Sequence, residues 1–96
     1  MYRKLEIVEQ EILQLNKEQQ EFLNGDYSKI ENSGIEFVKV RPIQDKIFEI
    51  KSNEIRSLFK YEKNQIIVIG VVFVKKTQKT PKEKIKLAKK RLKDIW

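Results

Sequence analysis

The chain has 96 residues, 40% hydrophobic and 36% charged, which is enough for one folded domain, and we expect a single domain over residues 1–96. It contains neither cysteine nor histidine, which excludes disulfides, thiolate nucleophiles, His-based zinc sites and imidazole bases. Residues 1–45 hold six Lys/Arg against nine Asp/Glu, a net charge of −3, and residues 46–96 hold fifteen against five, a net charge of +10. The concentration of positive charge in the second half favours a polyanionic or acidic partner.

The N-terminal segment shows helical periodicity. From Tyr2 to about Asn24 apolar residues recur every three or four positions, which predicts one helix with a single buried stripe and no strand before it. Asn24 and Gly25 are expected to end this helix, because glycine accepts the left-handed conformation found after helix ends. The polar stretch that follows, as far as Gly34, then reads as a loop.

Alternating hydrophobicity predicts three strands in the middle of the chain. The first runs from Ile35 to Arg41, and Pro42 then places it at a sheet edge or stops it, because proline cannot donate to a sheet ladder. Asp45 and Lys46 supply the next turn. Two further alternating segments with a tight connection are expected to pair as a hairpin: residues 47–51 and 55–61.

The C-terminal third predicts a buried strand followed by a helix. After a turn at residues 62–65, residues 66–74 are strongly apolar except for Gly70, which is typical of a central strand buried on both faces. Thr80, Pro81 and Glu83 have the spacing of a capping hydroxyl, a helix-starting proline and a reciprocal glutamate, so a C-terminal helix is expected to follow. Trp96 is expected to pack beneath it or to anchor a partner.

Neither a membrane nor a cofactor is expected. No apolar run approaches the roughly 18 to 20 residues of a membrane span, and the charged start leads into an acidic amphipathic stretch unlike a signal peptide. We therefore expect a cytoplasmic protein. The carboxylates are scattered without a recognisable ligand spacing, so no metal site is expected.

Three segments carry a family resemblance. Residues 73–81, FVKKTQKTP, followed by a Lys-rich helix, resemble the C-terminal signature of the phage-derived, HigB-like branch of the RelE toxin superfamily. Residues 47–51 resemble the family's strand of aromatic, Glu, Leu and Arg, and residues 55–59 its strand of aromatic, Arg, Val, Leu and aromatic. Lys51 stands where the family usually has Arg, and Val71 where many members have His.

The resemblance implies both a fold and a function. The fold is α+β and RelE-like, with the N-terminal helix packed on a four-stranded antiparallel sheet and a C-terminal helix. The function is that of a type II toxin, a metal-independent endoribonuclease that cuts mRNA, commonly on the ribosome. A cognate antitoxin, often a helix-turn-helix protein, holds it in check, and DNA is contacted only through that antitoxin. The alternative is a noncatalytic relative that binds RNA or an antitoxin without cutting.

Four residues are candidates for catalysis. Arg56 on a strand can grip two phosphate oxygens, or else form a surface ion pair with Glu49 or Glu54. Lys51 supplies a point charge in place of the family's Arg, or is simply solvated. Lys76 and Lys79, with Lys75, crowd positive charge near the start of the last helix and form a phosphate cradle with its free backbone amides, or else are simply solvated. Crowding of like charges also lowers a lysine pKa, which would let one of them act as a base.

Further residues are candidates for RNA binding. Arg41 extends the basic face, and Tyr61 either stacks on a base or packs in the core. Cations on the polar faces of the last helix either bind RNA backbone or keep the helix solvated. The candidates on this helix are Lys82, Lys86 and Lys90, and Lys75 before the helix is a further candidate for RNA binding.

Overall fold

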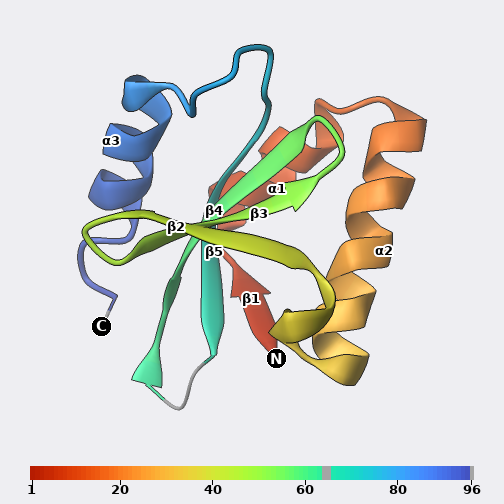
Figure 1. The fold of residues 1–96 in the computed structure, drawn as a ribbon, viewed down its shortest axis with the longest axis horizontal. Coiled ribbons are helices and arrows are strands. Elements are labelled where there is room, and N and C mark those ends of the chain that lie inside the picture. Colours follow the sequence, from red (N-terminus) through yellow and green to blue (C-terminus); the bar gives the residue numbers. More distant parts are fainter. Residues whose placement is uncertain (64–65, 96) are drawn as a thin grey trace.

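A computed structural model describes residues 1–63 and 66–95, which form a five-stranded mixed sheet with helices on both faces (Figure 1). The predicted α+β class is confirmed, with one strand more than expected. The elements in chain order are β1 (Tyr2–Lys4), α1 (Glu6–Leu13), α2 (Lys17–Ser33), the 3₁₀ turn η1 (Ile35–Phe37), β2 (Lys39–Gln44), β3 (Ile47–Ser52), β4 (Ile55–Tyr61), β5 (Ile67–Val74) and α3 (Lys82–Arg91). Part of the predicted turn at 62–65, and Trp96, lie outside the described residues.

The N-terminal segment is not one helix. Tyr2 begins β1, which lies parallel to β5, so the expectation that no strand precedes the first helix is wrong. The helical stretch also breaks between α1 and α2. Asn16 accepts a hydrogen bond from the backbone N–H of Gln19 (2.8 Å), and the Gln19 side chain accepts one from the backbone of Asn16 (3.0 Å). This capping box starts a new helix.

The glycine that was predicted to end the first helix lies inside α2. Leu23, Tyr27 and Ile30 are buried on either side of Gly25 and continue the apolar stripe through it. Their burial outweighs the roughly 1 kcal/mol that a glycine costs inside a helix. The predicted loop is therefore helix, which ends before Gly34 at a φ of 111°.

The strands are ordered β1-β5-β4-β3-β2, and all neighbours except β1 and β5 are antiparallel. The first predicted strand starts later than expected, because residues 35–37 form η1. β2 is an edge strand that contains Pro42, with a register shift between Pro42 and Gln44, which confirms the expected edge position. The turn at Asp45 and Lys46 is confirmed, with φ values of 50° and 68°. The hairpin of β3 and β4 is also confirmed.

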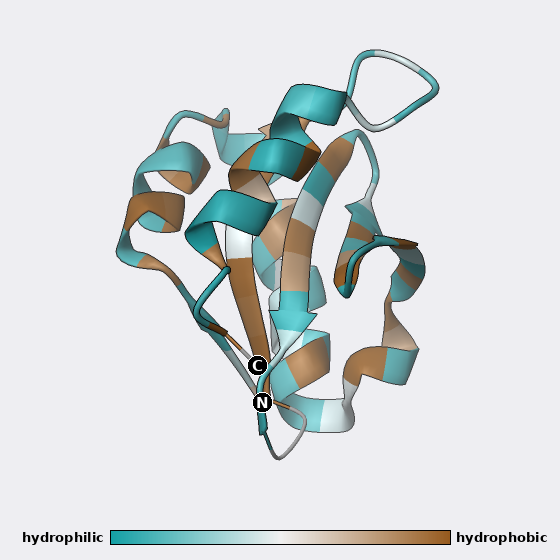
Figure 2. Cartoon of the chain, turned by 90° about the vertical axis from the view of Figure 1, so that its left-hand side faces the viewer, coloured by the Kyte–Doolittle hydropathy of each residue, from teal (hydrophilic) through white to brown (hydrophobic). Residues whose placement is uncertain are grey.

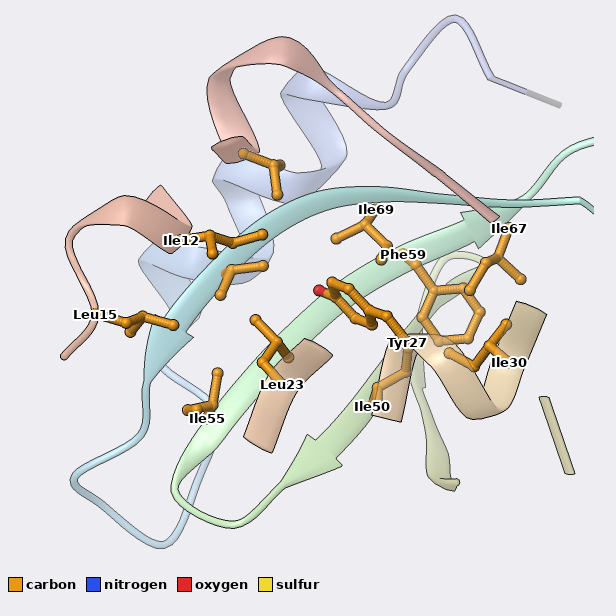
Figure 3. Close-up of a cluster of buried hydrophobic side chains, with 12 residues drawn as sticks. Ile12, Leu15, Leu23, Tyr27, Ile30, Ile50, Ile55, Phe59, Ile67 and Ile69 are labelled. Carbon is orange, nitrogen blue, oxygen red and sulfur yellow. The ribbon is translucent and has the colours of Figure 1, made fainter. Parts of the chain in front are cut away.

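Two hydrophobic layers hold the sheet between the helices. One lies under α1 and α2, where Tyr27 and Phe59 are its largest buried side chains (Figure 3). The Tyr27 hydroxyl forms a buried hydrogen bond of 2.8 Å with that of Ser57. The other layer lies under α3, and Figure 2, viewed from that side, shows a largely hydrophilic α3 over hydrophobic strands. β5 is buried on both faces, as predicted, but the central strand of the sheet is its neighbour β4. Within the described residues no helix is both long and apolar enough to cross a bilayer.

Gly70 makes room for α3. Leu58 pairs with Val71 and Phe59 with Ile69, so Gly70 is an extra, bulged residue of β5. A Cβ at Gly70 would lie 2.7 Å from Cγ of Leu92, which is fully buried. The close approach of α3 to the sheet therefore depends on the absence of a side chain here.

Gly70→Ala is expected to lower the free energy of unfolding by about 1 to 3 kcal/mol, because the added methyl overpacks the contact with Leu92. Gly25→Ala is the matched control, since nothing lies within 4 Å of a Cβ there. It is expected to stabilise by about 0.5 to 1 kcal/mol, because α2 gains helix propensity. Urea unfolding of both variants checks the pair, and a Gly70→Ala variant as stable as the native chain would contradict the contact.

Candidate functional site

Cross-strand register gathers positive charge on one face of the sheet. Lys39 in β2 pairs with Lys51 in β3, which pairs in turn with Arg56 in β4, so the three side chains point to the same side. They line a cleft of about 290 Å³. We call this the basic cleft, lined by Lys39, Val40, Arg41, Glu49, Lys51, Arg56, Lys75 and Gln78.

The basic cleft lies on the same face of the sheet as α3, next to the hydrophobic layer under that helix. Glu49 pairs with Leu58, and Leu58 is part of the hydrophobic layer beneath α3. Two residues further along the hairpin, Lys51 pairs with Arg56 on the same face. Arg56 pairs in turn with Phe73, which belongs to that layer and lies under Lys84 of α3. The face is thus apolar under the helix and cationic beside it.

Arg56 is held rigidly in the floor of the basic cleft. Its side chain is only 10% exposed, and its Nη1 donates hydrogen bonds to the backbone carbonyls of Asn53 and Ile55. Its buried Nε finds no hydrogen-bond partner among the described residues and lies 3.8 Å from a carboxylate oxygen of Glu49. A buried N–H without an acceptor is costly, and the nearby carboxylate of Glu49 offsets part of that cost as a counter-charge.

Glu49 organises the cations around it. Its side chain is 1% exposed, and one carboxylate oxygen accepts a hydrogen bond of 2.8 Å from Nε of Arg41. The other oxygen accepts a hydrogen bond of 2.5 Å from the hydroxyl of Thr80. Arg41 also donates from Nη2 to the Thr80 hydroxyl at 3.1 Å. Glu49 therefore ties β2 and the loop before α3 to the centre of the sheet.

The predicted capping role of Thr80 is wrong. α3 begins at Lys82 with Pro81 at the N-cap position and no side-chain cap. The Thr80 hydroxyl is buried and bonded to Glu49, 31 residues away in sequence, and is not available to the helix. The capping motif is present in the sequence, but the Thr80 hydroxyl donates to the buried carboxylate of Glu49 and accepts from Arg41, so its oxygen is engaged away from the helix.

Lys75 enters the basic cleft from the end of β5. Its backbone N–H donates to the carbonyl of Glu54 at 2.7 Å, which fixes its position beside the β3–β4 turn. Partial burial lowers its pKa, Glu49 opposes that change, and the positive charges of Arg41, Arg56 and Lys51 add to the lowering. Lys75 is therefore more easily deprotonated than an ordinary lysine, as a general base requires.

The structure brings together some predicted residues and separates others. Arg41, Lys51, Arg56 and Lys75 meet in the basic cleft. Lys76 and Lys79 are exposed on the adjoining loop and do not line it.

The helix candidates are exposed on α3. Lys82 and Lys86 line a separate shallow cleft with Gln44, and Lys90 lies outside both clefts.

Tyr61 lies on the opposite face of the sheet. It packs edge-on against Phe48 and Phe59, with ring centroids 5.1 and 5.4 Å apart, and partial burial raises its pKa. Val71, at the position where the resemblance places histidine, is fully buried in the layer beneath α3.

Sequence reasoning missed Lys39, Gln78 and the role of Glu49. Lys39 lies two residues before Arg41 on an alternating strand, so their shared face was readable from the sequence. Gln78 lies within the KKTQKTP string, but its place in the cleft depends on how the loop folds back. Within residues 1–63 and 66–95 no group of three or more His, Cys, Asp or Glu side chains is arranged to hold a metal ion.

Three solved structures share this fold at low sequence identity. The archaeal RelE–RelB complex from Pyrococcus horikoshii OT3 matches with a TM-score of 0.64 and 12% identity, covering 78% of this chain and 93% of that chain. The isolated E. coli RelE toxin gives 0.59 and 19%, covering 90% and 95%. The toxin–antitoxin complex RelBE2 from Mycobacterium tuberculosis gives 0.58 and 12%, covering 80% and 92%. The chain thus has a RelE-like α+β fold, as expected.

The sequence itself also has a family match. Among curated proteins no sequence matches the chain. The family described as phage derived protein Gp49-like (DUF891) matches residues 10–93, which include every strand of the basic cleft and the loop before α3. Because the match spans most of the sequence, this chain belongs to the phage-derived Gp49-like family.

Proposed function

We propose that this chain is the toxin of a type II toxin–antitoxin system, of the HigB-like branch, and that it is a metal-independent endoribonuclease that cleaves mRNA on the ribosome in the cytoplasm. The observation that carries the proposal is Arg56, which two backbone hydrogen bonds hold in a cleft lined by further cations. An RNA phosphate bound in this cleft neutralises the charge of the guanidinium and of the surrounding cations.

The proposed reaction uses the RNA's own 2′-hydroxyl as nucleophile. Its oxygen loses a proton to a base and attacks the adjacent phosphorus, and the bond from phosphorus to the 5′-oxygen breaks. The products are a 2′,3′-cyclic phosphate and a 5′-hydroxyl, whose oxygen takes up a proton as it leaves. Charge builds up on the phosphorane oxygens in between, so fixed cations stabilise the transition state.

The cleft supplies a group for each step. Arg56 binds the phosphorane oxygens, and its backbone hydrogen bonds hold it in place before the RNA arrives. Lys75 is the base, since its pKa is lowered. Lys51, directly across from Arg56 in the β-ladder, neutralises the developing charge and protonates the leaving oxygen. Arg41, with half of its side chain exposed, binds a neighbouring phosphate.

The exposed lysines extend this surface along the RNA. Lys76 and Lys79 flank the cleft on the loop at residues 75–81 and bind adjacent backbone phosphates. The lysines of α3 bind mRNA or ribosomal RNA in the same way: Lys82, Lys86 and Lys90. Tyr61 lies on the opposite face of the sheet. It contributes to RNA binding only where the RNA strand passes around the sheet to that face.

We also propose a protein partner. Two of the similar structures are complexes of RelE with RelB or of a toxin with its antitoxin. A cognate antitoxin is proposed to bind this chain and block the basic cleft. The first candidate to test is the product of an adjacent gene whose sequence has a helix-turn-helix pattern. DNA binding of the complex then resides in the antitoxin.

The test is cleavage of a translated mRNA with ribosomes present, comparing the native protein with Arg56→Ala. Losing this phosphate ligand is expected to slow cleavage by about 10²- to 10³-fold. Arg56→Lys, which keeps the charge but not the fork of donors, is expected to fall in between. Circular dichroism shows that each variant is folded. Intact mRNA with folded native protein would overturn the nuclease proposal and favour the noncatalytic RNA or antitoxin binder.

A further inference from the structure

A second cleft opens beside the basic cleft. It has a volume of about 210 Å³ and is shaped by α2, η1 and the first residues of β2. Lys39 and Lys51 line both clefts, so the two form one continuous surface. We call it the aromatic cleft, because the rings of Phe22 and Phe37 line it.

The two phenylalanines are unusually exposed. Phe22 is 43% and Phe37 is 59% exposed, and neither belongs to the two hydrophobic layers. A single exposed apolar side chain needs no explanation. Two aromatic rings in one cleft beside cations, however, are the arrangement on which unpaired nucleobases stack.

The cleft also holds a fixed hydrogen-bond acceptor. The side chain of Asp26 is only 11% exposed, and its Oδ2 accepts a hydrogen bond of 2.6 Å from Ser52. Its Oδ1 lies 3.7 Å from Nζ of Lys29, an ion pair that is longer than a hydrogen bond. A carboxylate only accepts hydrogen bonds, so it favours a ligand edge that presents N–H groups.

We propose that the aromatic cleft is a nucleobase subsite for a base next to the phosphate in the basic cleft. The proposal rests on the proposed function and adds base preference to it. Phe22 and Phe37 stack on the base, and Asp26 accepts from an exocyclic amino group. Adenine, guanine and cytosine carry such a group, whereas uracil has only its N3–H, flanked by two carbonyl oxygens that repel the carboxylate, and is disfavoured.

The test measures binding with cleavage blocked. Fluorescence anisotropy at low salt reports the affinity for 2′-O-methyl RNA hexamers of adenine, cytosine or uracil, whose nucleophile is masked. The native protein is expected to bind the adenine and cytosine hexamers more tightly than the uracil hexamer. Phe22→Ala with Phe37→Ala is expected to weaken binding by about 5- to 100-fold, as for the loss of base stacking. Leu13→Ala, which removes an exposed apolar side chain on α1, is the matched control.

Asp26→Asn separates the stacking from the base preference. Asparagine still accepts from Ser52 but also presents N–H donors, so the discrimination against uracil is expected to disappear. Equal affinity of the native protein for all three hexamers would overturn the subsite. The proposed function would still stand in that case if the native protein cleaves mRNA and Arg56→Ala does not. If the double phenylalanine variant binds RNA normally but loses the antitoxin, the cleft is a protein-docking surface, which also overturns the proposal.

Discussion

Lys75→Arg is expected to lower the rate of mRNA cleavage by about 10²- to 10⁴-fold, which is the usual contribution of a general base. Arginine keeps the positive charge but stays protonated at every pH that the protein tolerates. The substitution therefore removes proton acceptance and spares the electrostatic attraction of RNA. A loss of this size would assign Lys75 as the base.

The pH dependence makes the test specific. A lysine accepts a proton only in its neutral form, and that fraction rises about tenfold per pH unit below its pKa. Because the pKa of Lys75 is lowered from the ordinary 10.5, the native rate is expected to rise from neutral to mildly alkaline pH and to level off below that value. In Lys75→Arg the rise should vanish.

Neighbouring lysines provide the control. Lys76→Arg and Lys79→Arg change exposed residues on the same loop that do not line the basic cleft. Both are expected to keep the native pH profile and to change the rate only slightly. If either of them abolishes the rise with pH while Lys75→Arg does not, the base is misassigned among the three lysines.

Strands β3, β4 and β5 were readable from the sequence because their determinants are local, whereas β1 was missed and the strand at β2 was expected to start too early. Alternation between buried and exposed residues and the two-residue turn at Asp45 and Lys46 suffice to define the hairpins, and the apolar run of β5 defines an interior strand. The helix boundaries failed for the opposite reason. Gly25 signals a helix end, but the tertiary burial of Leu23 and Tyr27 overrides that signal. The Asn16–Gln19 capping box was a local signal that was overlooked.

The site divides in a similar way. Arg56 and Lys51 face each other because they belong to one hairpin, so their association follows from the turn between them. Lys75 and Thr80 reach the same place only because β5 lies next to β4 and the following loop folds back. A charge count over the loop at residues 75–81 cannot tell Lys75 from Lys76. Only the three-dimensional packing makes one of them partly buried beside Arg56.

Glu49→Ala is expected to lower the free energy of unfolding by about 3 kcal/mol, at the low end for breaking a buried ion pair. The change leaves Arg56, 10% exposed, without its nearest counter-charge and the buried Thr80 hydroxyl without its acceptor. Arg41 adds little, because its side chain is 54% exposed and water screens its ion pair. Each kcal/mol shifts the melting temperature of such a domain by about 4 to 8 °C, so thermal unfolding resolves the effect easily.

Two comparisons show whether the loss comes from this network. Glu21→Ala removes an exposed carboxylate on α2 and is expected to change the stability by less than about 0.5 kcal/mol. Thr80→Val and Glu49→Ala remove the same hydrogen bond, so the double variant is expected to lose less stability than the sum of the two single losses. The expected coupling free energy in this double-mutant cycle is about 0.5 to 3 kcal/mol. Additive effects would mean that Glu49 does not hold the loop. Coupled effects would mean that Glu49 holds the loop before α3 against the sheet.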